Sequence, residues 1–160
     1  MVVTHAVAIA INPRKNPSST ILPTAPRKSA VQALVAAPSS ATLNAARDAW
    51  LAARVPYQQT EVFRFGNAIV DDWEGKVNAW PLDEGLIDYV NAELYGMESD
   101  DNPLYTFNVI ANAQLTVNGA PVDASAITPT LLAETLHEAE GVEANVATGY
   151  HAIEFLLWGQ

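Results

Sequence analysis

A histidine and a glutamate stand close together near the end of the chain. His151 and Glu154 are three residues apart within the mostly apolar stretch 149–160. On a helix this spacing puts both side chains on one face, with Cβ atoms roughly 5–6 Å apart. An imidazole and a carboxylate at that separation can share a metal ion or exchange a proton. The alternative is a purely structural hydrogen bond, because such pairs outnumber functional sites.

Other kinds of site are poorly supported by the sequence. His137 and Glu138 begin the H-E-x-x-H pattern of zinc peptidases, but position 141 is Gly141, so the second histidine is missing. His137 is therefore predicted at the surface or at a helix cap. The chain has no cysteine, which excludes a thiolate metal site. One histidine with several carboxylates suits iron, manganese or another cation that prefers oxygen ligands.

Composition limits the partners of the chain. Its 160 residues carry a formal net charge of −10, which disfavours nucleic acid as a partner because phosphates require a basic surface. Nearly half of the residues are hydrophobic, so a real core can form. No apolar run reaches the ~18 residues that a membrane-spanning helix needs, so no transmembrane segment is predicted.

The first 28 residues are predicted to be an irregular N-terminal segment that stands apart from the rest. They contain Pro13, Pro17, Pro23 and Pro26, which disfavour a long helix. The segment has no clear signal peptide, because the positive start and the cleavage site are both missing. One hypothesis is that residues 1–28 reflect a misassigned start or a shifted reading frame.

From Ser29 onward the apolar residues recur mainly at helical spacing, which predicts an all-α fold. The first helix should end near Ala37, and Ser39 or Ser40 should cap a second helix that is kinked at Pro56 and stopped by Gly66. Further helices are predicted over 81–95, from Thr128 to about Ala139, and from Val142 to the end, with a polar loop over 67–79. Asn118-Gly119 predicts one short β-hairpin near 114–123.

Several stretches together resemble the imelysin family, whose other names describe a peptidase and an iron-regulated protein. The stretches are Gly149-x-His151-x-x-Glu154 with the Phe-Leu-Leu-Trp-Gly-Gln that follows, and the segments 142–148, 80–85 and 55–61. The resemblance covers about residues 29–160. It implies a helical fold of two bundle-like halves with a site near their meeting point. The chain thus looks like the N-terminal half of an imelysin-like helical domain, truncated at its C-terminus.

The resemblance also implies a ligand set and a role. The predicted metal ligands are His151, Glu154 and, as a further candidate, Glu61, with Gly149, Arg64 and Asp83 in support. The ion would be divalent or ferric, with iron favoured and zinc the alternative. The implied role is a metal-binding module linked to bacterial iron uptake, in the periplasm or cell envelope.

Two other functions stay open at this point. The first is a metallopeptidase in which Glu154 acts as general base. The second is an inactive helical fragment. A chain that holds only half of the domain would expose apolar surface, so self-association or association with the missing C-terminal half is also expected.

Overall fold

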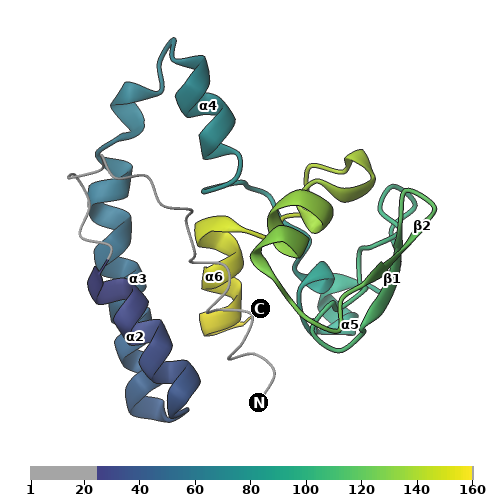
Figure 1. Ribbon diagram of the computed structural model, residues 1–160, viewed down its shortest axis with the longest axis horizontal. Coiled ribbons are helices and arrows are strands. Elements are labelled where there is room, and N and C mark those ends of the chain that lie inside the picture. Colours follow the sequence, from purple (N-terminus) through teal and green to yellow (C-terminus); the bar gives the residue numbers. More distant parts are fainter. Residues whose placement is uncertain (1–24, 160) are drawn as a thin grey trace.

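The computed structural model describes residues 25–159 (Figure 1). This part of the chain is mostly helical and carries one small antiparallel hairpin, which confirms the predicted fold class. None of its helices is long and apolar enough to cross a membrane.

Helices α2 (Ala25–Ala36) and α3 (Ser40–Gln58) form a helical hairpin at the N-terminal side (Figure 1). α2 begins before the predicted Ser29, because Pro26 lies in the first turn, where its missing N–H leaves no helical hydrogen bond unmade. Ser39 caps α3 as expected: its Oγ accepts from the Thr42 backbone N–H at 3.2 Å, and the Thr42 hydroxyl accepts from the Ser39 N–H in return.

The prediction that this second helix continues past Pro56 as far as Gly66 is wrong. α3 ends at Gln58, and a 3-10 turn (Glu61–Phe63) and helix α4 (Ala68–Glu74) follow, where a polar loop was expected. Arg64 bridges the two new elements, because its guanidinium pairs with Asp71 at 3.6 Å and with Glu74 at 3.1 Å. These pairs cross the turn and join α4 to the chain that precedes it.

The prediction of a helix over 81–95 is also wrong. The segment holds only a 3-10 turn (Glu84–Leu86) and the short helix α5 (Ala92–Tyr95). Its backbone bonds to distant chain instead: the Asp83 N–H donates to the Ala144 carbonyl at 2.8 Å, and the Asn108 N–H donates to the Gly85 carbonyl at 2.7 Å. Tertiary hydrogen bonds thus replace the helical ones that the sequence pattern indicates.

Strands β1 (Gln114–Val117) and β2 (Ala120–Asp123) form the predicted hairpin, with Gln114 opposite Asp123. Asn118 and Gly119 make its turn with φ of 50° and 74°, as an Asn-Gly turn requires. Leu115 and Val117 are buried in a core with the π-helix Leu131–Leu136 and with Leu86. The hairpin therefore depends on helical neighbours for its stability.

Thr128 caps the next helical segment, because its Oγ1 accepts from the Leu131 N–H at 3.1 Å. That segment includes the π-helix Leu131–Leu136 and is followed by a 3-10 turn (Ala139–Gly141). The prediction that the last helix starts at Val142 is wrong, since α6 spans Gly149–Trp158. Ala147, which falls within the helix predicted from Val142, belongs instead to the core around the hairpin.

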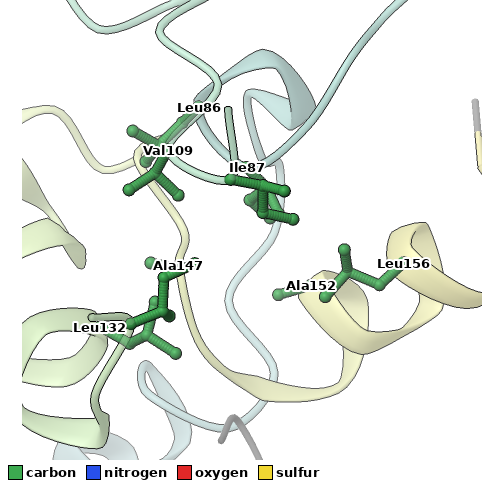
Figure 2. A pocket seen from close by; sticks show the side chains of 9 residues that line it. Leu86, Ile87, Val109, Leu132, Ala147, Ala152 and Leu156 are labelled. Atoms are coloured by element: carbon green, nitrogen blue, oxygen red, sulfur yellow. The ribbon is translucent and has the colours of Figure 1, made fainter. Parts of the chain in front are cut away.

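Helix α6 lies between the α2–α3 hairpin and the rest of the chain (Figure 1). Leu157 packs with Val31, Leu34 and Ala46, whereas Ala152 and Phe155 pack with a second cluster. A cavity of about 20 Å³ remains between Ala152 and Leu156 of α6 and the residues opposite them (Figure 2). Its lining is apolar, so it is a packing defect that could hold one water at most, without polar partners.

Candidate functional site

The start of α6 is fixed by close contact with the backbone at Val77. Gly149 has a φ of +91°, and a Cβ there would lie 2.5 Å from the Val77 carbonyl oxygen. The same oxygen accepts a hydrogen bond from the Tyr150 N–H at 2.7 Å. Glycine at 149 thus lets another chain segment reach the first turn of α6, two residues before His151.

Helix α3 holds the same turn from the other side. The Trp50 indole N–H donates to the Tyr150 carbonyl at 3.0 Å. The Arg54 guanidinium lies over the rings of Trp50, Tyr57 and Tyr150, with its carbon 5.0 Å from the centre of the Tyr150 ring. Burial, together with Glu74 and Glu61, raises the pKa of Tyr57 to about 12, so this phenol stays neutral.

His151 and Glu154 meet on α6 as their spacing predicts. His151 Nδ1 lies 2.9 Å from Glu154 Oε2, and the two side chains are 17% and 43% exposed. An ionised carboxylate only accepts, so Nδ1 carries the proton and donates it. Within residues 25–159 no group hydrogen-bonds to Nε2, so the carboxylate fixes the imidazole and leaves Nε2 available.

The pair lies on the wall of a groove of about 620 Å³. Eight residues line this groove, which we call the α6 groove: Trp80, Leu82, Glu84, His151, Glu154, Phe155, Trp158 and Gly159. The Trp80 ring lies against the imidazole, with centroids 4.9 Å apart. Trp158 lies one turn after Glu154 on α6. Trp80 lies just before the segment 81–95, and Glu84 lies within it, where the predicted helix does not form.

Glu61 and Arg64 lie outside the α6 groove. Glu61 is exposed, and its carboxylate is 3.6 Å from the Arg64 guanidinium, which also pairs with Asp71 and Glu74. Arg64 thus joins the turn to α4, and the structure does not bring Glu61 to His151.

Asp83, which was expected to support the metal site, bonds to a buried asparagine pair instead. Its Oδ2 accepts from the Asn102 side-chain amide at 2.6 Å, and that amide also donates to Asn145 Oδ1 at 2.7 Å. Asn102 and Asn145 are both buried, and the Asn145 amide also donates to the Ala139 carbonyl at 2.9 Å. This network joins three segments, and Asp83 is not among the residues that line the groove.

Of the two places predicted for His137, the structure confirms the helix cap, since His137 is the C-cap residue of the π-helix Leu131–Leu136. The surface position is wrong, because the side chain is only 2% exposed. Its Nε2 lies 3.1 Å from the Gly75 carbonyl, and its Nδ1 lies 3.3 Å from the Thr148 hydroxyl. That hydroxyl donates to the Lys76 carbonyl at 2.9 Å. His137 therefore ties the chain after α4 to the residue that precedes α6.

The chain matches the family described as Imelysin over residues 24–160. It belongs to the imelysin family. A stretch of this imelysin chain is also 45% identical over 58 residues to iron-regulated protein A of Synechococcus elongatus. That stretch is 36% of the chain and 16% of the relative, so the match covers a small part of the longer protein.

The donor atoms at the groove fit part of a metal site. One imidazole nitrogen and one carboxylate are ligands that iron, manganese and zinc accept. Within the range 25–159, however, no group of three or more His, Cys, Asp or Glu side chains could hold a metal ion. His151 and Glu154 thus provide two donors. Water or other ligand atoms would fill the remaining coordination positions of the ion.

Proposed function

We propose that this imelysin-family chain binds a metal ion, iron by preference, through His151 and Glu154, and serves iron uptake outside the bacterial cytoplasm. The observation that supports the proposal is the 2.9 Å contact between His151 Nδ1 and Glu154 Oε2 on the wall of an open groove. The name of the relative, iron-regulated protein A, supports the link to iron.

The geometry suggests separate roles for His151 and Glu154 in binding the ion. Metal-binding histidines commonly donate their second ring N–H to a carboxylate, which fixes the tautomer and orients the ring. Glu154 is placed to do this for His151, so Nε2 is the expected ligand atom. When bound, the ion supplies positive charge next to Glu154. The carboxylate could also turn to the ion directly.

Titration calorimetry of chelator-treated protein with Fe²⁺ (without oxygen) and with Zn²⁺ tests the proposal. His151→Ala should weaken metal binding at least tenfold because the imidazole donor is lost. Glu154→Gln keeps an oxygen that accepts from Nδ1. It should therefore cost about tenfold if Glu154 only orients the ring, and more if Glu154 is itself a ligand.

Glu61→Gln is the matched control, because Glu61 lies outside the α6 groove and should not change the affinity. Circular dichroism would verify that each variant folds. Iron binding that His151→Ala leaves unchanged would refute the proposal. A folded wild-type chain that binds neither metal would favour an inactive helical fragment.

A further inference from the structure

The α6 groove is much larger than a metal ion needs. Its volume of about 620 Å³ lies within the range of small-molecule sites. Apolar side chains from Leu82 and Phe155 contribute to its lining, next to the polar His151–Glu154 pair. A groove of this size and mixed character can accept an organic group with an extended body.

Trp80 gives the groove an aromatic platform. Its side chain is 67% exposed although it is one of the largest apolar groups in the chain. The His151 ring packs against the Trp80 ring, with an angle of 56° between the ring planes. Trp158 also lines the groove, but the Arg47 guanidinium already lies 5.4 Å from the centre of that ring. Trp80 is therefore the ring best placed to stack against a ligand.

The charges that line the groove favour a cation. Glu84 and Glu154 contribute carboxylates, and no lysine or arginine is among the lining residues. Within residues 25–159 the Glu84 carboxylate forms no hydrogen bond or ion pair, so its charge is available. The carboxyl end of α6 reaches the same groove at Gly159, and the helix dipole is negative there.

We propose that the α6 groove binds a guanidinium group on an apolar stem, such as an arginine side chain. A guanidinium is planar and stacks on aromatic faces while its N–H groups reach carboxylates. Trp80 would supply the stacking face, and Glu84 and Glu154 the acceptors. The chain already uses this contact internally, where Arg54 lies over Trp50, Tyr57 and Tyr150.

The proposal goes beyond metal binding and is tested without metal. N-acetyl-arginine amide is titrated into the chelator-treated chain, and the indole N–H signals of the tryptophans are followed by NMR. N-acetyl-citrulline amide, the neutral isostere, should bind at least tenfold more weakly. Trp80→Ala should weaken arginine binding about tenfold, and Glu84→Gln should weaken it in the same direction.

Trp73→Ala is the matched control, because Trp73 is 53% exposed but lies outside the groove. It should bind the arginine derivative as the wild type does. Equal affinity for the arginine and citrulline derivatives, or equal affinity of the Trp80→Ala and Trp73→Ala variants, would overturn the proposal. So would the absence of a saturable signal for wild type.

Two further titrations identify the source of the group. Agmatine presents a free guanidinium, whereas an alanine peptide with one central arginine presents it from a peptide chain. Tighter binding of either one supports the site and shows whether the groove prefers a free guanidinium compound or an arginine within a peptide. The iron titration is separate, so failure of arginine binding leaves the metal proposal intact, and failure of iron binding leaves this one intact.

Discussion

Gly149 is the residue at which the backbone of α6 and the chain at Val77 come closest. Alanine there would combine a positive φ with a Cβ 2.5 Å from a carbonyl oxygen. The strain of a left-handed non-glycine residue is about 1–3 kcal/mol, and the clash adds to it. We predict that Gly149→Ala lowers the free energy of unfolding by more than about 2 kcal/mol, measured by urea denaturation.

Gly66→Ala separates the two causes. Gly66 has a similar φ of +71°, but nothing lies within 4 Å of a Cβ built on it. Its substitution should therefore cost only the conformational strain, about 1 kcal/mol. If both variants lose equal stability, the contact with Val77 does not constrain α6, and Gly149 is needed only for its backbone conformation.

At the scale of elements, His137 connects the end of α4 to the start of α6. Burial lowers the pKa of its imidazole below the ordinary value of 6.5, although the nearby Glu138 and the Gly75 carbonyl oppose this shift and Lys76 adds to it. The folded chain therefore holds this proton less tightly than the unfolded chain does. The resulting stability is fully present above about pH 6.5 and is lost as the pH falls through the lowered pKa.

We predict that the free energy of unfolding falls as the pH drops from about 7 to 5, with a His137 contribution of at most about 1.4 kcal/mol per pH unit. His137→Gln keeps an amide that can donate to the Gly75 carbonyl but has no proton to gain in this range. Its unfolding free energy should change less steeply with pH. Parallel pH profiles of wild type and variant would show that His137 does not cause the dependence.

At the scale of the whole molecule, an exposed apolar surface marks the segment from the 3-10 turn through α4. It consists of Val62, Phe63, Phe65, Ile69 and Trp73, which are 53–98% exposed. Five large apolar side chains exposed within one short segment favour association. We predict that the chain self-associates as its concentration rises, measured by sedimentation velocity. Added salt should strengthen the association, because it screens the net charge of −10.

The double variant Phe65→Ser with Ile69→Ser should shift the chain toward the monomer. Tyr89→Ser with Leu94→Ser removes equally exposed apolar side chains outside the segment and should leave association unchanged. A chain that stays monomeric at every concentration, or control and test variants that behave alike, would contradict the assignment of this surface.

Local sequence signals predicted the parts of the fold that depend on near neighbours. Ser39 and Thr128 form caps where their types and positions indicate, and Asn118-Gly119 makes the hairpin turn. The pairing of His151 with Glu154 also follows from spacing alone, because both residues lie on one helix. Each of these features involves hydrogen bonds over four residues or fewer, which sequence periodicity can capture.

Contacts between segments far apart in the sequence decided the features that local signals did not predict. Between Trp80 and Val109 the backbone bonds to chain that is remote in sequence, so a helical pattern did not become a helix. The buried position of His137 and the place of Trp80 against His151 also depend on segments far apart along the chain. The sequence alone determined the family, the helical class and the His151–Glu154 pair. Only the tertiary structure placed Trp80 and Glu84 beside that pair, because no local periodicity records which distant segments come together.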